Sequence, residues 1–124
     1  MTETKKKILA IDNDLSFLKI LSEWFEFQGF DIITTDNGNS ALKLLENDHF
    51  DAIILDVVMG PPSGLDILKQ IKSSQNTKDI PVFMLSQMGE QDHQDRAREL
   101  GAEDYLVKAN FRLKDLTTKI QKVT

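Results

Sequence analysis

Three short runs of consecutive apolar residues divide the chain, and none of them alternates with polar positions. They lie at residues 8–11, 52–55 and 82–85. Uninterrupted apolar runs of this length predict strands that are covered on both faces of a sheet. Two weaker candidates, the more polar residues 32–35 and the short segment 105–107, predict the edges of the same sheet.

The segments between these runs repeat apolar residues at intervals of three and four, as amphipathic helices do. The predicted core faces are Phe17, Ile20, Leu21 and Trp24; Ala41, Leu42 and Leu45; Leu65, Leu68 and Ile71; and Leu113, Leu116 and Ile120. Strict alternation of five strands and five helices predicts an α/β fold, a parallel sheet with helices on both faces. Residues 90–101 offer only Ala97 and Leu100 as apolar anchors, so we expect their helix to be the least stable.

The length of the chain limits the number of domains that it can form. A chain of 124 residues can bury one core but is cramped for two domains, so we expect a single domain over residues 1–124 without an output domain. Residues 1–4 and the last two or three are expected to be disordered.

Twenty acidic side chains against 15 basic ones argue against a nucleic-acid partner. Because no segment predicts a membrane span or a signal peptide, we expect a cytoplasmic protein with no membrane partner.

Polar side chains follow four of the five predicted strands, at the ends that a parallel sheet brings to one edge. Asp12 and Asn13 follow the first strand, Asp56 the third, Ser86 the fourth and Lys108 the fifth. In the strand order 2-1-3-4-5, the first and third strands are neighbours, so their polar groups share one crevice. Clustered carboxylates repel unless a cation lies between them, and oxygen ligands suit Mg²⁺. The pattern predicts a magnesium site beside groups that can hold a phosphoryl group, with Asp56 as nucleophile.

Four segments, in this order and spacing, resemble the receiver domain of response regulators: ILAIDND, DAIILDVVMGPPSGLDIL, PVFMLS and GAEDYLVK. The resemblance covers nearly the whole chain and implies a flavodoxin-like, doubly wound sheet. It implies that Asp56 accepts the phosphoryl group, that Ser86 and Tyr105 form the switch, and that Lys108 is the family's lysine. By the same resemblance, the Mg²⁺ ligands fall on Asp12, Asn13, Asp56 and the backbone carbonyl of Val58.

The chain departs from the pattern of this family at several positions. Asn13 stands where the family usually has a carboxylate that touches Mg²⁺, so we expect weaker metal binding. Gly60 and Gln87 replace residues that are usual beside the acceptor and beside the switch hydroxyl. Ala109 replaces the proline that usually follows the lysine across a cis peptide bond, so this turn is expected to be trans or strained.

The resemblance implies a stand-alone receiver rather than a turnover enzyme. It would take its phosphoryl group from a histidine kinase or a histidine phosphotransfer protein, and then act on a downstream protein or relay the group. A second apolar row on the first helix, Leu15, Leu18 and Phe25, is a candidate docking surface for the donor. The alternative for this row is one broad buried stripe. Val58 and Met88 are expected to overhang the acceptor and, being apolar, to slow hydrolysis of the aspartyl phosphate.

Two other functions fit parts of the sequence. One is a pseudo-receiver, a protein-binding module in which Asn13 weakens metal binding so far that phosphorylation no longer matters. The other is a haloacid-dehalogenase-like phosphatase, because Asp12 and Asp14 after a strand imitate that family's nucleophile and acid. The phosphatase leaves Asp56 unexplained and needs more chain than 124 residues provide.

Overall fold

Five strands alternate with five helices along the chain. Their bounds are β1 Lys7–Ile11, α1 Leu15–Phe27, β2 Asp31–Thr35, α2 Gly38–Asn47, β3 Ala52–Asp56, α3 Gly64–Ser73, β4 Val82–Ser86, α4 Gln91–Glu99, β5 Asp104–Val107 and α5 Leu113–Val123. The computed structural model describes residues 5–87 and 89–124, so the expectation for residues 1–4 lies outside the described residues. All strand pairs are parallel and the order is β2-β1-β3-β4-β5, which confirms the predicted α/β fold.

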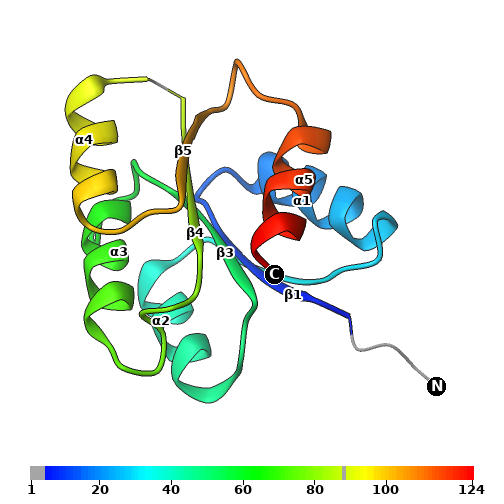
Figure 1. Cartoon of the computed structure of the whole chain (residues 1–124), viewed down its shortest axis with the longest axis horizontal. Coiled ribbons are helices and arrows are strands. Elements are labelled where there is room, and N and C mark those ends of the chain that lie inside the picture. The colour runs from blue at the N-terminus through cyan, green and yellow to red at the C-terminus, as the bar shows by residue number, and fades with distance from the viewer. Residues whose placement is uncertain (1–4, 88) are drawn as a thin grey trace.

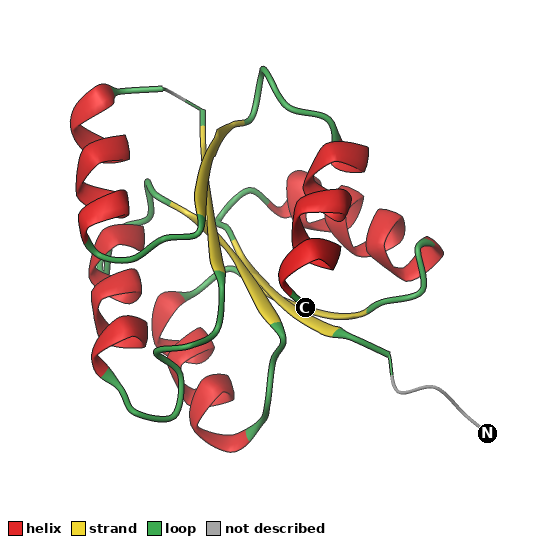
Figure 2. Ribbon diagram, in the orientation of Figure 1, coloured by secondary structure: helices red, strands yellow, loops and turns green. Residues whose placement is uncertain are grey.

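The helices cover both faces of the sheet, with α2, α3 and α4 on one face and α1 and α5 on the other (Figures 1 and 2). Each face has its own apolar core, because successive side chains of a strand point to opposite faces. Every residue of β3 and β4 is buried, whereas β2 and β5 lie at the edges and are partly exposed. The expectation of buried central strands and more polar edges is therefore confirmed.

The orientation of α1 differs from the predicted one. Leu18, Leu21 and Phe25 are the buried residues of this helix, whereas Leu15 and Ile20 are exposed. The prediction had placed Ile20 in the core, and that assignment is wrong. Of the two alternatives for the second apolar row, a docking surface or one broad buried stripe, Leu18 and Phe25 follow the buried stripe, whereas Leu15 is exposed. Two apolar stripes run side by side on this helix, so periodicity alone does not decide which of them faces the sheet.

Glycine is required at two helix ends with a left-handed backbone and at one close contact between two segments of the backbone. Gly29 and Gly101 follow α1 and α4 with φ of 91° and 99°, a region that side chains other than glycine rarely adopt. At Gly64, the first residue of α3, a Cβ atom would lie 1.9 Å from the backbone oxygen of Asp56. The start of α3 therefore packs directly against the backbone at the end of β3.

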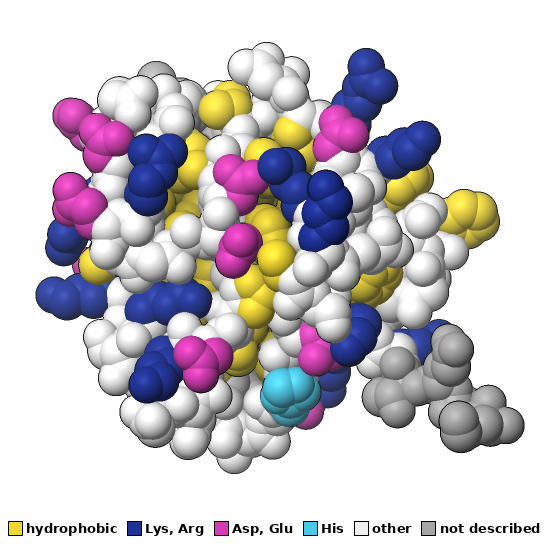
Figure 3. All heavy atoms as spheres, viewed as in Figure 1, with side chains coloured by type: hydrophobic (Ala, Val, Ile, Leu, Met, Phe, Trp, Pro, Cys, Tyr) yellow, Lys and Arg dark blue, Asp and Glu magenta, His cyan; other side chains and the backbone are white. Residues whose placement is uncertain are grey.

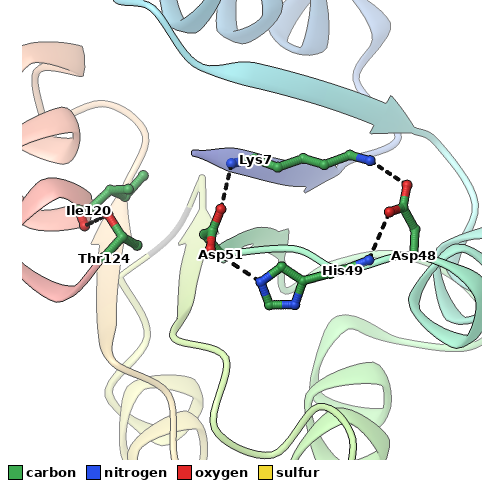
Figure 4. Close-up of polar contacts among 6 residues, drawn as sticks. All are labelled: Lys7, Asp48, His49, Asp51, Ile120 and Thr124. Atoms are coloured by element: carbon green, nitrogen blue, oxygen red, sulfur yellow. Dashed lines mark hydrogen bonds and ion pairs between the residues drawn. The ribbon is translucent and has the colours of Figure 1, made fainter. Parts of the chain in front are cut away.

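Ion pairs and hydrogen bonds join the chain at the opposite end of the sheet from the strand exits (Figure 4). The Lys7 amide donates to the Asp51 carboxylate at 2.8 Å, and the Lys7 side chain pairs with Asp48. His49 is an exposed surface residue, and its Nε2 lies 3.3 Å from Asp51 Oδ1.

Acidic and basic side chains are interspersed over the face drawn in Figure 3. Among the described residues, no helix is both long and apolar enough to cross a membrane.

Candidate functional site

The strand exits meet at one pocket of about 260 Å³. Its lining residues come from the ends of β1, β3, β4 and β5 and the loops that follow them: Asn13, Asp14, Asp56, Val58, Ser86, Gln87 and Lys108. Asp12 lies behind this lining and pairs with Lys108. The four polar positions that were predicted to converge are thus brought together, as expected when parallel strands end at the same edge of a sheet.

Asp12 and Lys108 form a nearly buried ion pair. Asp12 Oδ2 lies 2.7 Å from Lys108 Nζ, and the two side chains are only 3% and 11% exposed. The other carboxylate oxygen of Asp12 accepts a hydrogen bond of 2.9 Å from the Asp14 amide. Asp14 in turn caps α1, because its carboxylate accepts from the Phe17 amide at 3.1 Å. The turn between β1 and α1 is therefore held by two consecutive side-chain contacts to the backbone.

Asp56 ends β3 and is almost excluded from water, with an exposed fraction of 5%. Burial and, to a smaller extent, the negative charge of Asp12 raise the pKa of Asp56 to about 6. The positive charge of Lys108 and the amides of Val58 and Val57 oppose this rise. At neutral pH the carboxylate is therefore mostly ionised but held in an unfavourable environment, which favours the approach of a cation or of an electrophile.

Ser86 and Tyr105 lie on the same face of the sheet. In the register of β4 and β5, Met84 pairs with Tyr105 and Ser86 with Val107, so alternation places Ser86 and Tyr105 on one face, two pairs apart along the strands. Ser86 is fully buried at the pocket, and Tyr105 is partly buried against the core beneath α2, α3 and α4. The structure therefore places the two predicted switch residues on the same face of the sheet.

The loops around the pocket depart from the family pattern in different ways. Val58 lines the pocket with 62% of its surface exposed, and Gln87 lines it from the end of β4. Met88, the other residue expected to overhang the acceptor, lies outside the described residues. The cis peptide bond of the described chain is Pro61–Pro62, and Lys108–Ala109 is trans. Of the two alternatives for this turn, trans or strained, the structure has the trans bond.

The donor atoms around the pocket fit a small divalent cation. Asp12 and Asp56 would supply two carboxylates, Asn13 an amide oxygen and Val58 a backbone carbonyl, all of them oxygen donors of the kind that Mg²⁺ prefers. Burial and, second to it, the charge of Asp12 raise the pKa of Asp56, and a bound cation would favour the ionised carboxylate against both effects. Within the described part of the chain, however, no three acidic or imidazole groups converge on one point. The site therefore has less negative charge than a three-carboxylate cage.

Sequence signals account for one further contact of the site but not for another. An aspartate between a strand and a helix is often the N-cap of that helix, and Asp14 is the N-cap of α1. No signal predicts the position of Phe17, whose ring centroid lies 4.5 Å from Lys108 Nζ. Phe17 was assigned to the core by its spacing, and nothing in the sequence relates residue 17 to residue 108.

Comparison with known proteins identifies the family. The sequence model of the response regulator receiver domain matches residues 8–121. The chain belongs to the response regulator receiver family. A probable transcriptional regulator, ycf27 of Guillardia theta, is 34% identical over 98% of this chain and 46% of its own length. The transcriptional regulatory protein CpxR of Escherichia coli K12 is 37% identical over 94% of this chain and 48% of its own. The receiver domain thus spans about half the length of these relatives.

Solved structures agree with this assignment. The chemotaxis response regulator CheY4 of Vibrio cholerae superposes with a TM-score of 0.88 at 28% identity, over 98% of this chain and 100% of that one. A response regulator of Burkholderia pseudomallei was solved with a phosphorylated aspartic acid and a calcium ion. It superposes with a TM-score of 0.85 at 25% identity, over 94% of this chain and 67% of that one. The flavodoxin-like fold and the role in two-component signalling, as a signalling domain rather than a member of an enzyme family, follow from these matches.

Proposed function

We propose that this receiver domain accepts a phosphoryl group on Asp56 from a phosphohistidine of a histidine kinase or a histidine phosphotransfer protein. One observation supports the proposal above the others: the nearly buried Asp56 carboxylate shares a pocket with Ser86 and Lys108. A carboxylate oxygen forms a bond to phosphorus as the phosphorus–nitrogen bond of the donor breaks, and the departing imidazole takes a proton from solvent. The related Burkholderia protein was solved with its aspartic acid phosphorylated.

The proposed roles of the other residues follow from charge and position. Asp12, Asn13, Asp56 and the Val58 carbonyl would hold Mg²⁺, which supplies positive charge to the phosphoryl oxygens when it is bound. Lys108 adds a second positive charge at the edge of the pocket, and the Ser86 hydroxyl donates a hydrogen bond to a phosphoryl oxygen. The phosphoryl group carries close to two negative charges, so its arrival draws these groups inward.

The output of the domain would be a changed protein-binding surface in the cytoplasm, or transfer of the phosphoryl group to another histidine. When Ser86 moves toward the phosphoryl group, it vacates space on the face of the sheet where Tyr105 also lies, so the ring can turn inward. The adjacent α4 has Ala97 as its buried residue and otherwise polar side chains, so few contacts resist its displacement. The proposed switch surface is therefore formed by α4, β5 and α5.

Labelling with a small phosphodonor tests the proposal. Incubation with acetyl phosphate and Mg²⁺ is expected to add one phosphoryl group to the intact protein, detected by mass, and none to Asp56→Asn. Asp66→Asn, which changes an exposed aspartate on α3, is the matched control and should label like the wild type. An unlabelled wild type at saturating Mg²⁺ would instead support the pseudo-receiver, which binds its partner without phosphorylation.

A further inference from the structure

The ring of Phe17 lies beside the charged end of Lys108. The Lys108 ammonium is 4.5 Å from the centroid of this ring, and the Lys108 side chain is almost excluded from water. An ammonium over the face of an aromatic ring is attracted by the negative face of its π system, and the attraction strengthens as water is removed. Asp12 and Phe17 thus contact the same ammonium, one through charge and the other through its ring.

The backbone holds Phe17 in this place. Phe17 stands in the first turn of α1, where its amide donates to the carboxylate of Asp14, the cap residue. The amide of Asp14 donates in turn to Asp12, which pairs with Lys108. Four residues therefore form a closed ring of contacts, from Asp12 through Asp14 and Phe17 to Lys108 and back to Asp12. A displacement of Lys108 changes two of these contacts at once.

Packing alone does not account for this arrangement. Phe17 is only partly buried, and it lies at the margin of the apolar core that α1 and α5 cover. A leucine would supply apolar surface there, but it would offer no negative face to the ammonium. The long lysine side chain has many rotamers, and fixing one of them at the pocket requires contacts that leave the others less favourable.

We propose that Phe17 is a positioning residue that holds the Lys108 ammonium at the pocket through its aromatic face. The inference rests on the proposed phosphorylation of Asp56, because Lys108 acts there on the phosphoryl oxygens. Phe17 itself does not reach the reacting atoms. It keeps the ammonium beside Asp12 and Asp56 before the donor arrives. The Lys108 side chain is therefore already in the conformation that the transfer of the phosphoryl group requires.

Site-specific fluorination of Phe17 tests the proposal. Mono-, di- and trifluorophenylalanine keep nearly the shape of the ring while they progressively weaken its negative face. Labelling of Asp56 by acetyl phosphate at saturating Mg²⁺ should slow stepwise, by about twofold to fivefold at the trifluoro ring. In the unphosphorylated protein, NMR should find the Lys108 Hε protons shifted upfield by the ring, and the shift should decrease along the same series. Fluorinating Phe111, a partly buried ring of the same core, should change neither quantity.

Two further variants separate electrostatics from packing. Phe17→Tyr keeps the ring face and should preserve both quantities, whereas Phe17→Leu should lose the upfield shift and slow labelling at least as much as trifluorination does. A labelling rate or an Hε shift that stays constant across the fluorinated series would overturn the proposal. If the wild type is not labelled at all but its Hε shift follows fluorination, the placement of Lys108 by Phe17 stands, and the proposed phosphorylation fails.

Discussion

Lys108 Nζ and Asp12 Oδ2 lie 2.7 Å apart, and almost no water reaches either side chain. The pair joins the loop after β5 to the end of β1, across the exits of β3 and β4. It also places one positive charge beside two carboxylates, so removal of the lysine leaves Asp12 and Asp56 facing each other without a protein cation.

The Lys108→Met variant should therefore be destabilised in metal-free buffer. We expect its free energy of unfolding to fall by about 3 kcal/mol, the usual size when one partner of a buried pair is removed. Lys119→Met is the control, because Lys119 and Asp104 also lie 2.7 Å apart but are much more exposed. Its loss should stay below about 1 kcal/mol. Urea denaturation measures both, and equal losses would show that burial of the site pair has no energetic consequence.

The pKa of Asp56 makes the stability of the domain depend on pH. Since folding raises this pKa from 3.8 to about 6, the contribution of the protonated carboxyl is fully present below pH 3.8 and is lost as the pH rises through 6. Asp56→Asn carries no charge and should unfold with a free energy about 2–3 kcal/mol higher than the wild type at pH 7, in the presence of a chelator. The difference should shrink toward pH 4. Chemical denaturation at several pH values checks this, and a constant difference would assign it to another cause.

Replacing Asn13 by aspartate restores the carboxylate that the family usually has. Asn13→Asp should bind Mg²⁺ more tightly, by about tenfold or more, because a full negative charge joins a small group of oxygen donors. Asn76→Asp adds the same charge at an exposed position after α3, outside the pocket, and should leave the affinity unchanged. Calorimetric titration measures the affinities. An unchanged value for Asn13→Asp would mean that residue 13 does not reach the ion.

Val58 is expected to lengthen the life of the aspartyl phosphate. Its apolar side chain lines the pocket and cannot orient a water molecule for attack on phosphorus, whereas an amide can. Val58→Asn should therefore accelerate decay by about tenfold at saturating Mg²⁺, measured as loss of the phosphorylated mass over time. Val58→Thr, which has the same shape but only a hydroxyl, is the comparison. Equal decay in all three proteins would exclude access of water at position 58 as the determinant.

The corrected orientation of α1 divides the predicted docking row into two kinds of position. Leu15 is 66% exposed and Leu18 only 5%. Leu15→Glu should leave the melting temperature and labelling by acetyl phosphate unchanged while it slows transfer from a cognate phosphohistidine donor. Leu18→Glu buries a charge and should lower the melting temperature by 10 °C or more, about 3 kcal/mol in a domain of this size. Normal transfer to Leu15→Glu would remove this end of α1 from the docking surface.

Much of the fold was predictable because strands buried on both faces leave an unambiguous pattern. The first four residues of β3 and of β4 are apolar without alternation, and each strand ends in a polar residue, Asp56 or Ser86. The phase of α1 was not predictable, because its two apolar stripes overlap and only the folded chain brings Phe25 edge-on against the ring of Phe30, with ring centroids 5.4 Å apart. The contact of Phe17 with Lys108 joins residues that only the closed fold brings together.

Two glycines in the segment after Asp56 differ in whether a side chain would fit in their place. A Cβ at Gly64 would collide with the backbone of Asp56, whereas a Cβ at Gly60 would meet nothing within 4 Å. The segment is therefore anchored at its far end and open in its middle. A longer or more polar loop grafted beside Asp56 would therefore have room at residue 60, but any inserted segment must still end in a glycine at the first position of α3.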